Sequence, residues 1–265
     1  MELEGKTVLL TGATGGLGRA IAQALDERGV ALVLSSRKAP ELEQLSASLP
    51  GTDHRSLVAD LAEPGAAERL VAEAGKVDVL VTNASLPASG HLDDFSPEQL
   101  ERAVRVNLEA PIRMARQLVP EMRQRGAGQL VFISSLAGKV ASPRSSLYSA
   151  TKFGLRGFAL GLREDLFGSG VGVSVVLSGF IRDAGMFADS RARVPRIVGT
   201  GTPGQVGAAV VSAIEGDRAE VEVAPFAQRL GAAFAHRRPH LAAALTRRDS
   251  GRVADDVAKG QVGKR

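Results

Sequence analysis

The sequence predicts a doubly wound α/β fold, with a parallel sheet of about seven strands and helices on both of its faces. Apolar runs of strand length alternate with stretches of helical period along the chain. The runs are nearly continuous in apolar residues, which is typical of parallel strands that helices cover on both sides. These strand-like runs lie at residues 8–10, 30–34, 54–58, 77–81, 130–133, 171–177 and 220–223.

The composition is that of a globular chain with one sizeable core. Of its 265 residues, 44% are hydrophobic and 23% are charged, which excludes a disordered tail or a fibre. The chain has no cysteine and four histidines, so we expect no disulfide, no cysteine-based zinc site and no other metal. The absence of cysteine favours a reducing, cytoplasmic location. Because Glu2, Glu4 and Lys6 precede only a few strand-like positions and no apolar run reaches about 18 residues, we expect no signal peptide and no membrane span.

Basic charge is concentrated towards the end of the chain. From residue 226 onward there are nine Lys and Arg against three Asp and Glu, a net charge of +6, whereas residues 1–225 have 24 against 26 and a net charge of −2. A basic face across the fold is the usual sign of nucleic-acid binding. Because residues 1–225 are slightly acidic, we predict no nucleic-acid partner. We expect one domain over residues 1–225 and a basic extension over residues 226–265.

A glycine-rich turn joins the first predicted strand to an amphipathic helix over residues 17–28, which ends at Gly29. Glycines let the backbone approach a phosphate closely, and the free amides and the positive dipole end of the helix attract the anion. The turn therefore predicts nucleotide binding, although a flexible surface turn has the same composition. The candidate residues are Gly12, Thr14, Gly16, Leu17 and Gly18.

The spacing of Gly12, Gly16 and Gly18 differs from the common G-x-G-x-x-G pattern and resembles the form found in the short-chain dehydrogenase/reductase family. The resemblance covers roughly residues 5–225. It implies a Rossmann-like sheet and makes residues 1–225 a single dinucleotide-binding and catalytic domain.

The end of the second strand indicates which dinucleotide is bound. An enzyme that selects NAD usually has an acidic side chain there, but this chain has Ser35, Ser36, Arg37 and Lys38. Arg37 can pair with the 2′-phosphate of NADP, and Ser36 can donate a hydrogen bond to it. We therefore predict NADP(H), with an exposed basic turn as the alternative.

Two further segments are assigned to the cofactor by the resemblance alone. Asp60, with Leu61 beside it, follows the third strand, where family members bind the adenine amino group. Asn83 and Ala84 resemble the Asn-Ala of the family's N-N-A-G motif, which supports the backbone around the cofactor. Thr82 and Ser85 replace the first Asn and the Gly of that motif.

Tyr148 and Lys152 lie four residues apart in a segment of helical period, so their side chains share one face of the helix. An unperturbed tyrosine has a pKa of about 10, and a neighbouring ammonium lowers that pKa towards the range that acid–base catalysis needs. Such a pair also occurs by chance on exposed helices. In the family, this lysine also binds the cofactor, so both residues are candidates for catalysis and for cofactor binding.

Ser135 stands thirteen residues before Tyr148, at the end of the fifth strand. In the family, a serine at this separation binds the substrate carbonyl, and its hydroxyl can stabilise the developing alkoxide. Ser134 is the neighbouring alternative, but alternation along the strand and the family spacing favour Ser135. The glycine turn, Ser135, Tyr148 and Lys152 in this order are far more specific together than any one of them.

Asn107 is a candidate because Pro111 follows it by four residues within a helix expected over about residues 97–123. Proline has no amide hydrogen, so the Asn107 carbonyl loses its helical partner and can hold a water. In the family, the matching carbonyl anchors a water that links the lysine to solvent. An ordinary proline kink with a surface asparagine is the alternative.

The sixth strand ends with Ser178 and Gly179, where family members have Pro-Gly and, four residues later, a Thr that is Asp183 here. The resemblance assigns Gly179 and the backbone of Ile181 to the nicotinamide. An aspartate can accept a hydrogen bond from the carboxamide but cannot donate one as threonine does. Residues 184–204 match the family's substrate lid, and Met186, Phe187 and Val194 are candidates for its lining, or for the core.

Residues 226–248 combine Leu, Ala and Phe with five arginines, and Pro239 interrupts any single helix. A helical arm packed on the subunit or on its neighbour is the expectation. A basic amphipathic segment on anionic lipid or nucleic acid is the alternative, which leaves peripheral membrane contact open. By resemblance we expect a homodimer or homotetramer in which the helices that carry Asn107 and Tyr148 meet a second subunit.

These observations predict an NADP(H)-dependent oxidoreductase that transfers hydride between nicotinamide and a carbonyl or alcohol of a small molecule, with ketone or aldehyde reduction as the expected direction. The catalytic candidates are Asn107, Ser135, Tyr148 and Lys152. The alternatives are a non-catalytic NADP(H)-sensing or scaffold protein on the same fold and an NAD-dependent alcohol oxidation. The sequence does not define the substrate.

Overall fold

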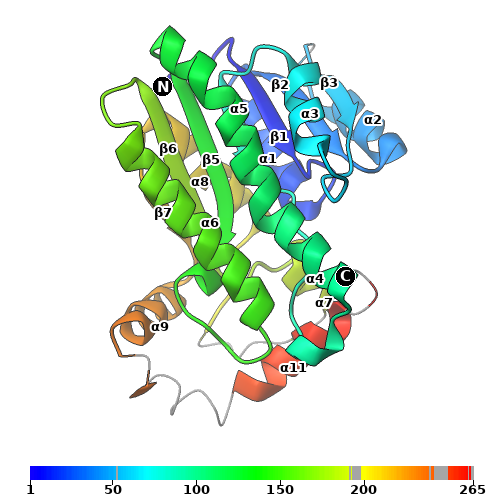
Figure 1. Ribbon diagram of the computed structural model, residues 1–265, viewed down its shortest axis with the longest axis vertical. Helices are drawn as coiled ribbons and strands as arrows, with labels where there is room; N and C mark the ends of the chain where they lie inside the picture. The colour runs from blue at the N-terminus through cyan, green and yellow to red at the C-terminus, as the bar shows by residue number, and fades with distance from the viewer. Residues whose placement is uncertain are drawn as a thin grey trace.

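A computed structural model describes residues 1–51, 53–190, 192, 198–238, 240–241, 250–261 and 263. Within this part of the chain, seven parallel strands form one sheet in the order β3-β2-β1-β4-β5-β6-β7 (Figure 1). The predicted fold class is confirmed. The strands are β1 (Thr7–Thr11), β2 (Ala31–Ser36), β3 (Arg55–Val58), β4 (Val79–Thr82), β5 (Gly128–Ser135), β6 (Val171–Ser178) and β7 (Glu220–Val223).

Each predicted strand is present, and the bounds differ by no more than two residues at either end. The largest extension is β5, which continues past the apolar run 130–133 because Ser134 and Ser135 still pair with Leu177 and Ser178 of β6. The strand order reverses direction on either side of β1, which pairs with both β2 and β4. This topological switch point opens a crevice at the carboxyl ends of β1 and β4, where such sheets bind ligands.

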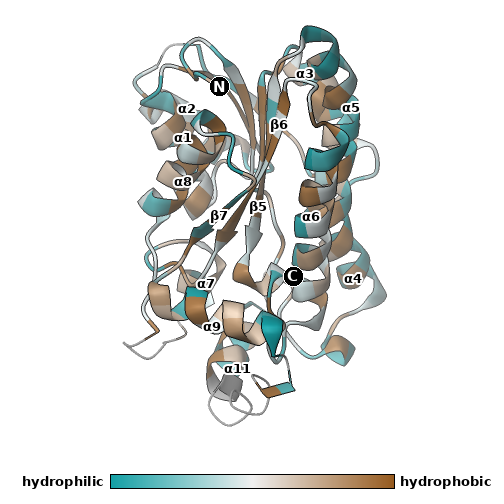
Figure 2. Cartoon of the chain, turned by 90° about the vertical axis from the view of Figure 1, so that its left-hand side faces the viewer, coloured by the Kyte–Doolittle hydropathy of each residue, from teal (hydrophilic) through white to brown (hydrophobic). Residues whose placement is uncertain are grey.

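Helices cover both faces of the sheet and bury two apolar cores (Figure 2). One face is covered by α1 (Gly16–Asp26), α2 (Ala39–Ser48) and α8 (Pro203–Glu215), and the other by α3 (Ala66–Ala74), α5 (Ala110–Arg125) and α6 (Ser146–Asp165). Burial on both faces explains why the strands are nearly continuous in apolar residues. Because helices cover both faces, the carboxyl ends of the strands are the part of the sheet left open to a ligand.

The helix predicted over residues 97–123 is interrupted by a π-helical turn. It consists of α4 (Pro97–Val104), the π turn Arg105–Glu109 and then α5. The amide of Ala110 donates to the carbonyl of Arg105, five residues back. Since Pro111 has no amide hydrogen, the regular four-residue pattern cannot continue here, and the chain takes up the wider turn.

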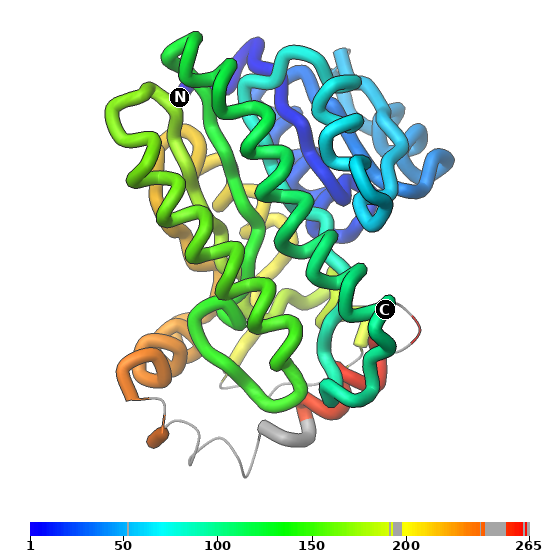
Figure 3. Tube along the Cα trace, viewed as in Figure 1, coloured from blue at the N-terminus to red at the C-terminus, as the bar shows by residue number. Residues whose placement is uncertain are grey.

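The chain returns to the open end of the sheet after β6. There, α7 (Gly185–Ser190), α9 (Phe226–Arg237) and α11 (Ser250–Gln261) gather beyond the carboxyl ends of the strands (Figure 3). Helix α11 packs on α7, and Arg144, before α6, pairs with Asp255 at 2.8 Å. Val194, Pro239, Arg247 and Arg248, which the sequence analysis singled out, lie outside the described residues. None of the helices in the described ranges combines the length and apolar character that a membrane crossing needs.

Candidate active site

The glycine turn between β1 and α1 has no room for a side chain at three of its glycines. Gly12 has a φ of +64°, and a Cβ atom on it would come within 2.8 Å of the Ala84 Cα atom. A Cβ atom on Gly18 would overlap the Gly12 carbonyl, and one on Gly16 would overlap Ala184. The turn is thus packed against the segment after β4 and against the start of α7.

Asn83 and Thr11 bind the two neighbouring strand ends to each other. The Asn83 amide Nδ2 donates to the carbonyls of Gly12 at 3.0 Å and Thr11 at 3.2 Å. In return, the Thr11 hydroxyl accepts from the backbone amides of Asn83 and Ala84. Asn83 therefore joins the glycine turn to the segment after β4. Thr11 was missed as a site residue, although a hydroxyl on the last residue of β1 is a visible signal.

A cavity of about 250 Å³ lies above this turn at the switch point of the sheet. It brings together the candidates from the ends of β1, β2, β3 and β4. It also includes Met186, a proposed lid residue, and Leu86 and Val106, which the sequence analysis did not select. The candidates that line it are Gly12, Thr14, Gly16, Leu17, Gly18, Ser36, Arg37, Asp60, Leu61, Asn83 and Ala84.

The residues after β2 form the polar rim of this cavity. The Ser36 hydroxyl lies 2.6 Å from that of Thr14, which belongs to the glycine turn. The Arg37 side chain is half exposed and lies 3.8 Å from the Asp60 carboxylate. Asp60 also accepts a hydrogen bond from the backbone amide of Ala62 at 2.9 Å, which orients its carboxylate. A guanidinium and two hydroxyls therefore surround the place predicted for the 2′-phosphate.

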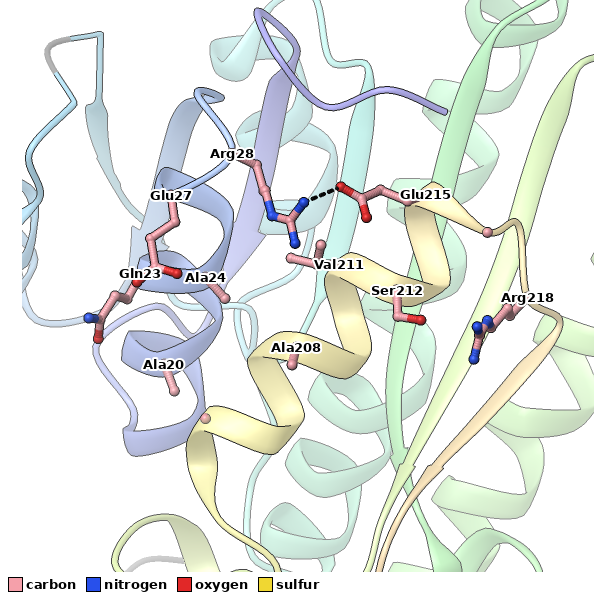
Figure 4. Close-up of a pocket in the computed structure, with 12 residues that line it drawn as sticks. Ala20, Gln23, Ala24, Glu27, Arg28, Ala208, Val211, Ser212, Glu215 and Arg218 are labelled. Carbon is pink, nitrogen blue, oxygen red and sulfur yellow. Dashed lines mark hydrogen bonds and ion pairs between the residues drawn. The ribbon is translucent and has the colours of Figure 1, made fainter.

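The lining of this cavity suits the adenosine and phosphate part of a dinucleotide. The glycine turn removes three Cβ atoms from its floor, the N-terminus of α1 opens into it, and no acidic residue stands at the end of β2. A second hollow of about 650 Å³ lies between α1 and α8 and is crossed by the 2.8 Å pair of Arg28 and Glu215 (Figure 4). It contains none of the predicted site residues.

Ser135, Tyr148 and Lys152 meet at the carboxyl end of β5. Tyr148 and Lys152 lie in the first turns of α6, and the Lys152 Nζ atom is 5.6 Å from the centre of the Tyr148 ring. Lys152 is 3% exposed and donates to the Ile133 carbonyl at 3.1 Å. The three side chains thus form one cluster from two elements, in which Lys152 is buried and Ser135 and Tyr148 are partly exposed.

The neighbouring serines have different partners. The Ser134 hydroxyl donates to the Lys152 backbone carbonyl at 3.1 Å, so it is held against helix α6. The Ser135 side chain is hydrogen-bonded to that of Tyr148. Its hydroxyl also donates to the Ser178 carbonyl at 3.1 Å and accepts from the Ala137 amide. The geometry favours Ser135 over Ser134 as the partner of Tyr148.

Burial dominates the electrostatics of this cluster. It raises the pKa of Tyr148 to about 12, and the hydrogen bond with Ser135 offsets only part of this rise. It lowers the pKa of Lys152 to about 8, since the ammonium has lost its water. The pKa of Tyr148 is therefore raised and not lowered as predicted, because the desolvation of the phenolate outweighs the hydrogen bond with Ser135.

Asn107 lies in the middle of the π-helical turn and is buried. Its Oδ1 atom accepts from the Leu86 amide at 2.7 Å and from the Ser85 hydroxyl at 3.1 Å, and its Nδ2 atom donates to the Leu86 carbonyl. The side chain thus anchors the segment after β4. The alternative of a surface asparagine at a kink is excluded, because Asn107 is 1% exposed.

The residues after β6 form a separate part of the site. Gly179 and Ile181 do not line the described part of the cavity above the glycine turn, and neither do Tyr148 and Lys152. Ile181 bridges to Gly201, and the Phe180 amide donates to the Oε1 atom of Gln228. Asp183 has a φ of +69°, a conformation that aspartate tolerates better than threonine. Gln228 was missed because the sequence analysis placed it in the tail.

Comparisons with known proteins agree with this geometry. The family model described as short chain dehydrogenase matches residues 6–195, and the chain belongs to the short-chain dehydrogenase/reductase family. Over 227 residues the chain is 37% identical to the ketoacyl reductase HetN of Nostoc sp., covering 83% of this chain and 79% of that protein. It is 35% identical to the mouse dehydrogenase/reductase SDR family member 7B, covering 68% of this chain, and spans 58% of the length of that relative.

Solved structures show the same architecture. A short-chain dehydrogenase from Streptomyces avermitilis superposes with a TM-score of 0.77 at 26% identity and covers 92% of this chain and 98% of its own. A short-chain dehydrogenase from Sphingobium yanoikuyae in complex with NADPH superposes with a TM-score of 0.74 at 27% identity, covering 93% of both chains. This protein is therefore an oxidoreductase with a Rossmann-like fold.

Proposed function

We propose that this protein is an NADP(H)-dependent reductase that converts a ketone or aldehyde into an alcohol. The observation that carries the proposal is the cluster of Ser135, Tyr148 and Lys152 at the same end of the sheet as the glycine-floored cavity. The similarity to a ketoacyl reductase and to an NADPH-bound dehydrogenase supports both the reaction class and the cofactor.

The cofactor would be held along the ends of the strands. The amides of the glycine turn and the N-terminus of α1 would bind the pyrophosphate, Arg37 and Ser36 the 2′-phosphate, and Asp60 the adenine. Gly179 and Ile181 would border the nicotinamide. When bound, NADPH supplies the hydride that reduces the carbonyl carbon.

The protein's own groups would handle the oxygen of the substrate. Tyr148 would donate its phenolic proton to the carbonyl oxygen as that oxygen gains negative charge, and Ser135 would donate a hydrogen bond to the same atom. A pKa of about 12 keeps the phenol protonated at neutral pH, the form that reduction requires. For this, the Ser135 hydroxyl must leave the Ser178 carbonyl, to which it donates here.

Lys152 and Asn107 would restore the proton that Tyr148 gives away. With a pKa of about 8, Lys152 can change its protonation state near neutral pH and still favour the transient phenolate next to it. Pro111, four residues after Asn107, has no amide hydrogen to donate to the Asn107 carbonyl. This carbonyl would therefore hold a water between Lys152 and solvent. Tyr148, Lys152 and Asn107 would thus share one proton path, and Ser135 would orient the carbonyl oxygen.

Turnover tests the assignment of Tyr148. Carbonyl compounds, beginning with 3-ketoacyl thioesters, are screened with NADPH for oxidation of the nicotinamide. We expect Tyr148→Phe to lower kcat by roughly 10³-fold, because it removes the proton donor, while NADPH affinity changes by less than about twofold. If Tyr148→Phe turns over substrate as fast as the wild type, Tyr148 is not the proton donor. NADPH binding without turnover of any compound would favour the sensing or scaffold protein.

Binding of the two nicotinamide dinucleotides tests the cofactor. Calorimetry should show tighter binding of NADPH than of NADH, and Arg37→Gln should weaken NADPH roughly 10- to 100-fold without weakening NADH, since it removes a charge-assisted contact to the 2′-phosphate. Arg69→Gln is the matched control, because Arg69 is an exposed arginine paired with Glu63 away from the cavity. Equal affinities of the wild-type protein for NADH and NADPH would refute the proposed selectivity.

A further inference from the structure

Helix α9 is attached to the protein through its polar side. The Gln228 side chain lies on the inner face, where it accepts from the Phe180 amide at 3.2 Å and donates to the Gly199 carbonyl at 2.8 Å. Ala232, one turn further on, is 7% exposed. Arg229 pairs with Glu222 of β7 at 3.1 Å. The inner face thus consists of polar and small side chains that fix the rotation of the helix.

The outer face of α9 is apolar. Phe226, Leu230 and Phe234 follow one another at four-residue spacing and are 76%, 58% and 43% exposed. A helix on the surface of a globular protein normally has the opposite arrangement, with apolar residues towards the core. Because the inner contacts hold α9 in this orientation, the three large side chains remain on the outside and favour a contact partner.

The same segment is basic throughout. Residues 226–248 include five arginines and two histidines and no aspartate or glutamate. Arg237 and Arg238, at the end of α9, are exposed, and no carboxylate among the described residues forms an ion pair with either of them. An apolar stripe next to two exposed arginines is complementary to a surface that is both anionic and apolar beneath.

We propose that α9 is a peripheral docking element for an anionic lipid surface, through the juxtaposition of the exposed Phe226-Leu230-Phe234 stripe with Arg237 and Arg238. The apolar side chains enter the boundary between headgroups and acyl chains, and the arginines pair with lipid phosphates. No catalytic residue takes part, so docking is independent of the proposed reductase activity.

A second copy of the chain explains this face less well. Three partly exposed side chains offer on the order of 300 Å², whereas a stable interface buries roughly 800 Å² on each partner. A second α9 would also bring further arginines and no carboxylate from residues 226–248. A lipid surface compensates the charge and needs no large complementary area.

The position of α9 gives docking a consequence for the site. The helix lies at the end of the molecule where β5 and β6 end (Figure 1) and outside residues 6–195, which match the family model. Its Gln228 contacts the segment that follows β6. A docked α9 therefore turns the open end of the sheet towards the lipid, where an apolar substrate would be concentrated.

Co-sedimentation with vesicles tests the proposal on the full chain. We expect the protein to sediment with vesicles of equimolar phosphatidylcholine and phosphatidylglycerol at low ionic strength, to be released by high salt, and to stay in solution with phosphatidylcholine alone. Replacing Phe226, Leu230 and Phe234 by Gln should weaken binding roughly tenfold or more. Arg237→Gln should weaken it roughly fivefold.

Phe167→Gln is the matched control, because Phe167 is 90% exposed but lies between α6 and β6, at the opposite end of the sheet. It should sediment like the wild type. No binding to the mixed vesicles, or equal loss in Phe167→Gln and the triple variant, would overturn the proposal. It is also overturned if the triple variant binds vesicles normally but changes the molar mass of the protein in light scattering, since the stripe then joins two copies.

Discussion

The first turns of helix α6 and the whole of helix α9 lie at the same end of the sheet (Figure 1), and each helix reverses the usual placement of polar and apolar residues. Helix α6 buries a lysine, Lys152, that is 3% exposed, and α9 leaves Phe226 76% exposed. In α6 the reversal gathers ionisable groups where they are desolvated, whereas in α9 it presents apolar side chains to the outside. When the surrounding contacts hold a side chain against its usual buried or exposed placement, a functional site is the expected reason. The two helices indicate two different functions at one end of the molecule.

The largest expected effect concerns the buried side of α6. Lys152→Met keeps the volume of the side chain but removes the ammonium next to Tyr148, so turnover should fall by at least about 100-fold. Lys76→Met, which changes an exposed lysine before β4, should leave turnover unchanged. Steady-state kinetics of the two variants test this prediction. A similar loss of turnover in both would mean that a lysine far from α6 contributes to turnover as much as Lys152.

The same variant should increase stability, with a defined pH dependence. Because the folded pKa of Lys152 is about 8 and the unfolded value is 10.5, burying the ammonium costs free energy in full below pH 8. Between pH 8 and 10.5 the unfolded chain binds more protons than the folded one, so this cost disappears as the pH rises. Lys152→Met should therefore raise the free energy of unfolding by about 3 kcal/mol at pH 7 and by much less above pH 10.5. Denaturant titrations at both pH values would contradict this if the gain were equal.

On α9, the inner face should matter more for stability than the outer one. Gln228→Leu removes the hydrogen bonds to the Phe180 amide and the Gly199 carbonyl, so unfolding should become easier by about 1–2 kcal/mol. Gln23→Leu on α1 is the control, because Gln23 is exposed beside the hollow between α1 and α8. Thermal unfolding should separate the two variants, and an equal change would mean that Gln228 does not anchor α9.

The smallest effect is expected on the outer face of α9. Since Phe226, Leu230 and Phe234 are exposed, replacing all three by Gln should change the free energy of unfolding by less than about 1 kcal/mol. Turnover of a water-soluble substrate should also stay the same. A loss comparable to that of Gln228→Leu would show that the stripe packs inside the protein, and the contrast between the two faces would then fail.

Local patterns were sufficient to predict the sheet, and together with the family resemblance they indicated the candidate site residues. Apolar runs of strand length follow from burial on both faces, Gly12 and Gly18 are needed where backbone segments almost touch, and the four-residue spacing of Tyr148 and Lys152 places both on one face of α6. Pro111 likewise predicts the break in the helix, because it has no amide to donate. All of these depend on neighbours in the chain.

Long-range packing decided the rest. Which of Ser134 and Ser135 contacts Tyr148 depends on how β5 meets α6, and the pKa of Tyr148 depends on how much water the assembled site excludes. The rotation of α9 is set by Gln228 through partners 29 and 48 residues away. Sequence alone determined the elements and the chemistry they hold, because those follow from local geometry. Only the tertiary structure decided orientation and desolvation, because both arise from contacts between distant segments.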